Sequence, residues 1–393
     1  MSAMRAVFVT AAGLLAWTYA AFPIVLVLRG RFRRRPYAAA DITPPVTVVV
    51  AAHDEEAAID ARLENLLALD YPNDRLEIVV ASDGSTDRTV GLARRREPAV
   101  RVLDLPRVGK AAALGAAVAQ SRGDVLVFTD ANSAYDSAAV RRLVRPFADP
   151  SVGGVAGNQV YLPPSGRPEG SPAGERGYWD VDRVFKTAES DAGSVVSATG
   201  AIYAIRRELF SAVPDDVTDD FHETLAVVDA GRRFVFAPDA IAWEPVAPSG
   251  DAEFDRKVRV MVRGLRCVVR WRRLLDPRRT GFFAAELLTR KVLMRTMALP
   301  LLALFVSSLG LARTSRVARL LAAGQVAGYG MGVAGLVLER NRGHAPRLLA
   351  LPAYFCLVQA ASMVSTWRLL RGRRIDRWQP ARHAAPDPME RAA

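Results

Sequence analysis

Acidic and amide side chains follow three apolar segments of this sequence, at the point where each segment ends. The run DVLVFTDAN stops on Asp130 and Asn132, VTVVVAA is followed by His53 and Glu55, and LEIVVAS is followed by Asp83. If these segments are neighbouring strands, the acids meet at one edge, where their repulsion requires a cation or a hydrogen-bonding ligand. Each cluster alone has a simpler explanation, since SDGST is also a turn that can cap a helix.

The elements that position these residues alternate between two periodicities. Residues 46–52, 76–82, 100–105 and 124–130 are short runs rich in β-branched residues, and the segments between them have helical spacing, as in GKAAALGAAVAQ. This alternation predicts an α/β fold with a mainly parallel sheet buried on both faces. Ligands of such sheets bind at the carboxyl ends of the strands.

Composition excludes several classes of protein. The chain has 393 residues, half of them hydrophobic, and a formal net charge of +12. Its arginines are scattered among apolar segments instead of lining one polar face, so we read them as membrane flanks and expect no nucleic-acid partner. The two cysteines, Cys267 and Cys356, have no spacing that suggests a disulfide framework or a zinc site.

An uncharged stretch near the N-terminus predicts a membrane anchor. Residues 6–28 carry no charge, and a helix of that length spans about 35 Å, enough to cross a bilayer. A signal peptide is the alternative, but no Ala-x-Ala-like site precedes the cluster RGRFRRRP, so a retained anchor is favoured. The arginines after the span place the following domain in the cytoplasm of a multi-pass cell-membrane protein.

Three further apolar runs lie near the C-terminus, at residues 296–312, 320–338 and 348–367. Three spans would put the arginine-rich tail outside, against the positive-inside rule. The glycine-rich run 320–338 is alternatively re-entrant or packed against protein, so the number of spans stays open by one. Residues 281–295 mix aromatic, aliphatic and basic side chains, which predicts an interfacial helix, with a buried core helix as the alternative.

These patterns predict five regions along the chain. They are an anchor with its basic flank (1–35), a cytoplasmic domain (36–276), an amphipathic interfacial helix (277–295), C-terminal transmembrane helices (296–370) and a basic tail (371–393).

Six motifs occur in an order that resembles the family 2 glycosyltransferases. They are PPVTVVVAAHDEE, VVASDGSTDRT, GKAAALGAA, GDVLVFTDANS, SATGAIYAIRRELF and TDDFHETLAVVDAGRRFVFAPDAIAWE, which cover roughly residues 44–276. The resemblance implies a GT-A fold and an inverting, nucleotide-sugar-dependent transferase. The flanking apolar runs are similar to those of the membrane-bound branch that includes cellulose, chitin and hyaluronan synthases.

The resemblance implies a divalent cation, Mg²⁺ or Mn²⁺, at Asp130 and Asn132. A hard cation held by one or two oxygen ligands leaves positions for phosphate oxygens and neutralises the leaving diphosphate. The family has a second carboxylate where this chain has Asn132, so weaker metal binding or help from another acid is expected. The simpler reading of Asn132 is a loop cap.

The resemblance also places a nucleotide-sugar donor. Ala52, His53 and Glu55 match residues that line the nucleoside, Asp83 matches the aspartate that binds the base, and Lys110 is placed to meet the diphosphate. His53 replaces a common tyrosine, and a plain surface histidine is the alternative. The spacing around the lysine excludes a Walker phosphate loop.

The segment TDDF carries the catalytic base by analogy. Asp220 matches the carboxylate that takes the proton of the acceptor hydroxyl, and Asp219 is interpreted as its structural neighbour. Acidic residues also favour a helix N-terminus through the dipole, and both roles are compatible. Gly200 and Ala201 are expected to form a close-packed floor for the acceptor.

One departure from the family pattern bears on the product. Processive synthases carry Gln-x-x-Arg-Trp, where this chain has Lys257, Val260 and Met261, although Arg259 or Arg263 is still expected to reach phosphate. We therefore expect transfer of one or a few sugars to a lipid-linked or growing glycan in cell-surface or extracellular polysaccharide synthesis. A processive synthase is the alternative. A sugar nucleotidyltransferase lacks support because AAHDEEAA has no glycine-rich basic loop, and a non-catalytic scaffold predicts loss of acids that are present.

Overall fold

The computed structural model describes residues 2–162, 173–245, 250–342 and 346–372. The chain divides into two compact units. One contains Met1–Leu28, Pro168–Asp182 and Gly250–Arg374, and the other contains Arg29–Arg167, Arg183–Ser249 and Ile375–Ala393. We call them the helical unit and the sheet unit.

The sheet unit is built on one eight-stranded sheet with the order β3-β2-β1-β4-β7-β6-β8-β5. Its strands are β1 (Val46–Ala52), β2 (Leu76–Asp83), β3 (Arg101–Leu105), β4 (Val125–Asp130), β5 (Ala134–Tyr135), β6 (Val152–Leu162), β7 (Tyr203–Arg206) and β8 (Arg233–Pro245). The pairs that join β3, β2, β1 and β4 are parallel. The four predicted strands are therefore confirmed to within one residue at their ends.

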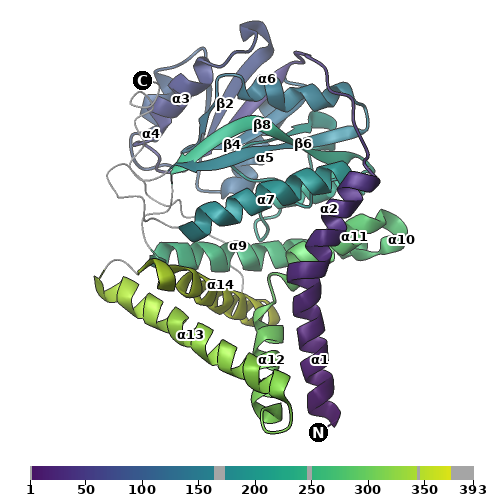
Figure 1. Ribbon diagram of the computed structural model, residues 1–393. Helices are drawn as coiled ribbons and strands as arrows, with labels where there is room; N and C mark the ends of the chain where they lie inside the picture. The colour runs from purple at the N-terminus through teal and green to yellow at the C-terminus, as the bar shows by residue number, and fades with distance from the viewer. Residues whose placement is uncertain (1, 163–172, 246–249, 343–345, 373–393) are drawn as a thin grey trace. The chain divides into compact units, whose positions relative to one another are not determined.

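Helices cover both faces of this sheet (Figure 1). They include α3 (Ile59–Leu67), α4 (Thr89–Arg94), α5 (Lys110–Gln120), α6 (Ala139–Val144) and α8 (Asp219–Asp229), while α7 runs from Ala173 to Ala192. Short 3-10 turns lie at Asn73–Arg75, Arg145–Ala148 and Arg207–Leu209.

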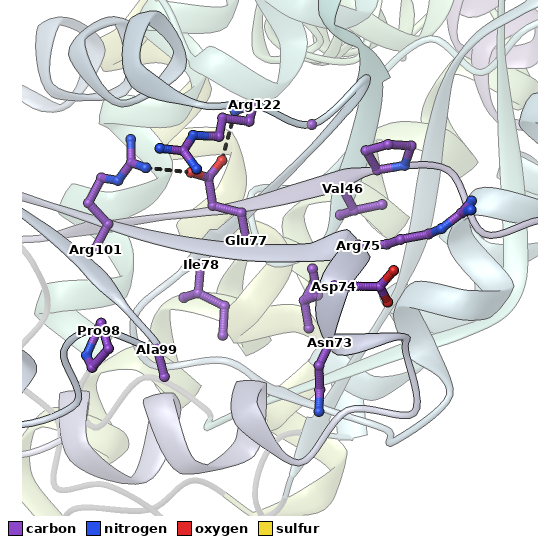
Figure 2. A pocket seen from close by; sticks show the side chains of 13 residues that line it. Val46, Asn73, Asp74, Arg75, Glu77, Ile78, Pro98, Ala99, Arg101 and Arg122 are labelled. Carbon is purple, nitrogen blue, oxygen red and sulfur yellow. Dashed lines mark hydrogen bonds and ion pairs between the residues drawn. The ribbon is translucent and has the colours of Figure 1, made fainter.

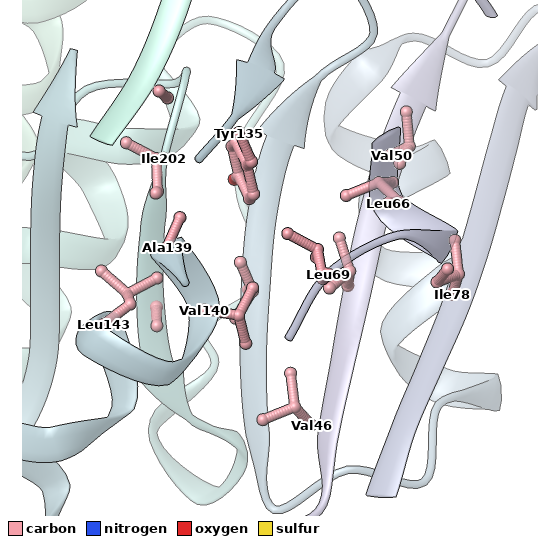
Figure 3. Close-up of a cluster of buried hydrophobic side chains, with 14 of the residues drawn as sticks. Val46, Val50, Leu66, Leu69, Ile78, Tyr135, Ala139, Val140, Leu143 and Ile202 are labelled. Atoms are coloured by element: carbon pink, nitrogen blue, oxygen red, sulfur yellow. The ribbon is translucent and has the colours of Figure 1, made fainter. Parts of the chain in front are cut away.

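Alternate residues of the strands supply two separate apolar cores. Val48 and Val50 pack with side chains of α3, α4 and α6, whereas Val49 and Ala51 pack with α5 and α8. Figure 3 shows the first core, with Leu66 and Val140 among the strand side chains. Burial on both faces explains why β1 is apolar except at Thr47, because neither set of alternating side chains meets water.

The helical unit contains most of the remaining helices. The N-terminal helices are α1 (Ser2–Ala16) and α2 (Phe22–Phe32), joined by a π-helical segment, Trp17–Ala21. Further along lie α9 (Gly250–Arg270), a 3-10 turn (Arg272–Leu275), α10 (Pro277–Thr280), α11 (Phe282–Leu287), a second π-helical segment (Leu288–Leu293), α12 (Ala298–Leu311), α13 (Arg316–Arg342) and α14 (Arg347–Leu370).

Three helical stretches of the described chain are long and apolar enough to cross a membrane: Ser2–Phe32, Arg316–Asn341 and Leu348–Leu370. Only 22%, 17% and 22% of their apolar windows is buried inside the protein. The stretches contain the predicted anchor and two of the predicted C-terminal spans. The remaining span, residues 296–312, differs from the prediction, because Phe282–Leu293 and Ala298–Leu311 meet the criterion only together and are bent by 68°. The predicted basic tail lies largely outside the described residues.

Candidate active site

The acidic segments converge on one edge of the sheet, as the strand pattern predicts. Ala51 of β1 pairs with Asp130 of β4, and Ala52 pairs with Ser82 of β2. Because the three strands are parallel and in register, their carboxyl ends and the residues that follow share one edge. Ala52 and Asp83 are almost fully buried there, whereas Asp130 and Asn132 are partly exposed.

The Lys110 side chain contacts two carboxylates at this edge. Its Nζ lies 2.8 Å from Asp130 Oδ1 and 3.2 Å from Asp219 Oδ2. The three side chains are 15%, 33% and 17% exposed. Burial alone would lower the pKa of the Lys110 ammonium, but the two carboxylates raise it above its usual range. The lysine is therefore a permanent cation between two acids.

Local sequence explains how these groups meet. Lys110 is the first residue of α5 and follows Gly109, whose φ of +93° is a conformation that glycine adopts readily. Asp219 and Asp220 open α8 after the extended residue Thr218. Acids at a helix start are stabilised by the dipole, so the predicted structural role and a place at the site coincide.

Asp83 is tied to the loop that leads to Lys110. Asp83 Oδ1 accepts hydrogen bonds from the backbone N–H groups of Val108 and Gly109, both at 2.7 Å. Asp83 Oδ2 lies 3.7 Å from Arg107 Nε and accepts no hydrogen bond from the described residues. A buried carboxylate oxygen in this state has capacity for a ligand donor.

The turns after β1 and β2 are interlocked. Asp54 Oδ1 accepts from the backbone of Thr86 at 2.7 Å, and the backbone N–H of Glu55 donates to Thr89 Oγ1 at 2.8 Å. His53 Nε2 lies 3.5 Å from Asp54 Oδ2. Burial, then the nearby carboxylates led by that of Asp130, raise the pKa of Glu55 to about 7.

The turn at Gly200 and Ala201 packs beside Asp130. A Cβ at Gly200 would lie 3.0 Å from Asp130 Oδ2, so glycine leaves room beside that oxygen. The Ala201 carbonyl accepts from Thr129 Oγ1 at 2.9 Å, which fixes this turn against β4. Among the described residues no three His, Cys, Asp or Glu side chains form a metal cluster. The divalent cation expected at Asp130 and Asn132 stays a prediction.

A buried polar network behind this edge was not anticipated from the sequence. Glu244 of β8 accepts from Ser133 Oγ at 2.8 Å and from Gln159 Nε2, and the Gln159 side-chain oxygen accepts from Thr199 Oγ1. All four side chains are at most 9% exposed. The network joins the residues next to Asn132 and Gly200. Glu244 ends a recognised motif, but no spacing rule relates it to Ser133.

Arg263 and Lys257 lie in α9 of the helical unit, where Lys257 Nζ donates to the Tyr354 hydroxyl at 2.9 Å. The expected contact between Arg263 and phosphate stays a prediction.

A pocket of about 380 Å³ lies at the opposite, amino-terminal ends of β1 and β2. Figure 2 shows Glu77 between Arg101 and Arg122 there. The residues that line this pocket include none of the candidate catalytic, substrate-binding or metal-binding residues.

Comparison with known proteins relates part of this chain to a known family. The model of glycosyl transferase family 2 matches residues 47–213. An N-acetylglucosaminyltransferase of Rhizobium meliloti (strain 1021) is 32% identical over 216 residues, which is 50% of each chain. A beta-monoglucosyldiacylglycerol synthase of Synechocystis sp. is 37% identical over 116 residues, 28% of this chain and 24% of that protein. The chain spans about half the length of the first of these curated relatives.

A solved structure is similar over nearly the whole chain. It is a mannosyltransferase from Pyrobaculum calidifontis in complex with GDP-Man and Mn²⁺, 25% identical, with a TM-score of 0.70 over 94% of this chain and 100% of that one. The sheet unit thus has a GT-A-like α/β fold. Residues 47–213 of this chain are therefore similar to glycosyl transferase family 2.

Proposed function

We propose that the protein is a membrane-bound, inverting glycosyltransferase. It transfers a sugar from a nucleoside diphosphate sugar to a hydroxyl of a lipid-linked or growing glycan in polysaccharide synthesis at the cell surface. The observation that carries the proposal is the group of Lys110, Asp130 and Asp219, which joins β4, α5 and α8 within 3.2 Å at the carboxyl edge of the sheet.

The donor binds along this edge. Asp83, with an oxygen that accepts no hydrogen bond from the described residues, takes an N–H of the base, and Ala52, His53 and Glu55 line the nucleoside. The Lys110 ammonium meets the diphosphate, because a permanent cation stabilises the negative charge that develops on the leaving group.

Asp220 acts as the general base. Its carboxylate takes the proton of the acceptor hydroxyl while the oxygen forms a bond to C1 of the sugar. The bond between C1 and the diphosphate oxygen breaks at the opposite face, so the anomeric configuration inverts and the diphosphate leaves with the bonding electrons. Gly200 and Ala201 support the acceptor beside Asp130.

A divalent cation would be held by Asp130 and Asn132. When bound, it supplies Lewis-acid neutralisation of the diphosphate charge. The mannosyltransferase of similar fold was solved with Mn²⁺.

The protein lies in a membrane, where it meets a lipid-linked acceptor. Three apolar stretches and the RGRFRRRP cluster support a multi-pass protein of the cell membrane with its catalytic domain in the cytoplasm. Arg263 of α9 is proposed to contact phosphate. The beta-monoglucosyldiacylglycerol synthase among the relatives supports an acceptor that carries a lipid.

The test is release of nucleoside diphosphate by the full-length protein in detergent, with UDP- and GDP-sugars, Mg²⁺ or Mn²⁺, and a polyprenyl-phosphate or oligosaccharide acceptor. We expect turnover with one donor, and a loss of about 10²- to 10⁴-fold in Asp220→Asn because the base is removed. Nucleotide affinity should be unchanged in this variant.

Two results would contradict the proposal. Sugar transfer that survives in Asp220→Asn would show that Asp220 is not the general base. Absence of both turnover and nucleotide binding would favour a non-catalytic scaffold protein. The length of the product separates a transferase of one or a few sugars from a processive synthase.

A further inference from the structure

We infer that Asp219 is a positioning residue for the donor site. Its carboxylate holds the Lys110 ammonium where the diphosphate binds, and so connects that site to the helix that carries Asp220. The inference rests on the proposed function, because it takes Lys110 as the diphosphate ligand.

The lysine ammonium is contacted by carboxylates from two different elements, a strand and a helix. Asp130 Oδ1, at the end of β4, lies 2.8 Å from Lys110 Nζ, and Asp219 Oδ2, at the start of α8, lies 3.2 Å from it. A lysine side chain is a point charge on a flexible four-carbon stem, so one partner restricts it less than two. Since Asp130 is also the proposed metal ligand, Asp219 is the partner that stays available when the cation arrives.

The backbone that carries Lys110 is restrained from the other end. Val108 and Gly109 donate to Asp83. A Cβ at Gly84 would lie 2.8 Å from the backbone nitrogen of Arg107, so the turn after β2 packs directly under this loop. The loop 107–110 is therefore held by Asp83, the proposed ligand of the nucleobase, and by Asp219, which contacts Lys110 at its end.

Asp219 and Asp220 differ in their surroundings although they are adjacent. Asp219 reaches Lys110, whereas Asp220 Oδ1 accepts from the backbone N–H of Phe221 at 2.8 Å. The simpler explanation of Asp219 is an acid that stabilises the helix start through the dipole. That role does not involve Lys110. If it were the only role, removal of the Asp219 carboxylate would change the nucleotide affinity by the same factor with and without the lysine.

A double-mutant cycle separates these explanations. The affinity for GDP and for UDP, each with MnCl₂, is measured by calorimetry on the full-length protein in detergent. The proteins are the unmodified chain, Asp219→Asn, Lys110→Met and the double variant. We expect each single substitution to weaken binding about tenfold, and the double variant to bind no more weakly than Lys110→Met, since interacting residues are not additive. Effects that multiply in the double variant would overturn the inference.

Controls keep the result specific. Asp229→Asn makes the same chemical change in the last turn of α8 and should leave affinity unchanged; a tenfold loss there would point to a general helix effect and overturn the inference. Asp219→Ser also removes the carboxylate, so it replaces Asp219→Asn in the cycle if that variant melts early. In enzyme assays Asp219→Asn should raise the KM for the donor more than it lowers kcat. A loss confined to kcat would contradict the positioning role.

The outcomes also separate the inference from the proposed function. If the unmodified protein binds neither nucleotide, both fail. If it binds one and the effects multiply, the proposed function stands and only the role of Asp219 is lost.

Discussion

At the scale of single residues, the site is a balance of charges. Lys110 lies between Asp130 and Asp219, and the Asp130 carboxylate also acts on the nearby carboxyl group of Glu55. One lysine does not neutralise both of its carboxylate partners, so this edge favours a cation together with its phosphate ligands over a free anion.

Asp130→Ala tests the metal assignment. We expect nucleotide binding in Mn²⁺ to weaken at least about tenfold, to the level that the unmodified protein shows with a chelator, because the carboxylate ligand is lost. Titration of GDP or UDP with Mn²⁺ and with EDTA measures this. Equal affinity in all conditions would remove Asp130 from the site.

Glu55 predicts a dependence of stability on pH. Burial, followed by the Asp130 carboxylate, raises the pKa of Glu55 from 4.5 to about 7. The folded state therefore binds this proton more tightly than the unfolded chain does. Its stabilising contribution is complete below about pH 4.5 and is lost as the pH rises through about 7. We expect Glu55→Gln to raise the Tm, measured in chelator, more at about pH 8 than at about pH 5. A pH-independent difference would be evidence against the raised pKa.

At the scale of elements, paired strands and helix starts bring distant residues together. The parallel register of β1, β2 and β4 aligns their ends. Strands β6 and β8, which also pair in parallel, place Gln159 and Glu244 behind the turns at Ser133 and Thr199. The candidate site is therefore supported by elements that lie beyond the four parallel strands β3, β2, β1 and β4.

The Glu244 network should be needed for stability. Glu244→Ala leaves the buried Ser133 hydroxyl and the Gln159 amide without this acceptor, which costs roughly 1–3 kcal/mol for each unsatisfied group. Thermal unfolding in detergent measures the effect. Glu244→Gln keeps one acceptor and should be milder, so equal Tm values for the two variants would argue against the hydrogen bonds as the cause.

At the scale of the whole molecule, a sheet unit with an acidic edge is combined with a helical unit whose long helices expose apolar side chains. Val9, Leu320 and Leu348 are 66%, 73% and 75% exposed. Leucine and valine on the outer surface of a long helix suit lipid, because water would make that exposure unfavourable.

We expect the full-length protein to stay with membranes after washing with sodium carbonate at high pH and to be released by detergent. Spanning helices are anchored by the burial of their apolar surface in the bilayer, which alkali does not reverse. Immunoblotting of the pellet and supernatant is the measurement, with a peripheral protein as the control. Release by carbonate would contradict a spanning protein.

Much of the sheet could be predicted from local pattern, because strands buried on both faces read as continuous β-branched runs. VTVVVAA is β1 to the residue, and the acids at the strand ends followed from the parallel arrangement. The apolar stretches at both ends of the chain were equally visible. Their hydropathy does not specify geometry, which is why the bend of 68° before α12 was not expected.

Tertiary structure alone decided which side chains touch. The sequence by itself determined that Lys110, Asp130 and Asp219 lie at element ends, but their mutual distances depend on how α5 and α8 pack on the sheet. Glu244 and Ser133 are separated by 111 positions and share no periodicity. Contacts of this kind arise from the packing of the folded chain, which leaves no local signal, whereas burial and strand direction leave a pattern in every few residues.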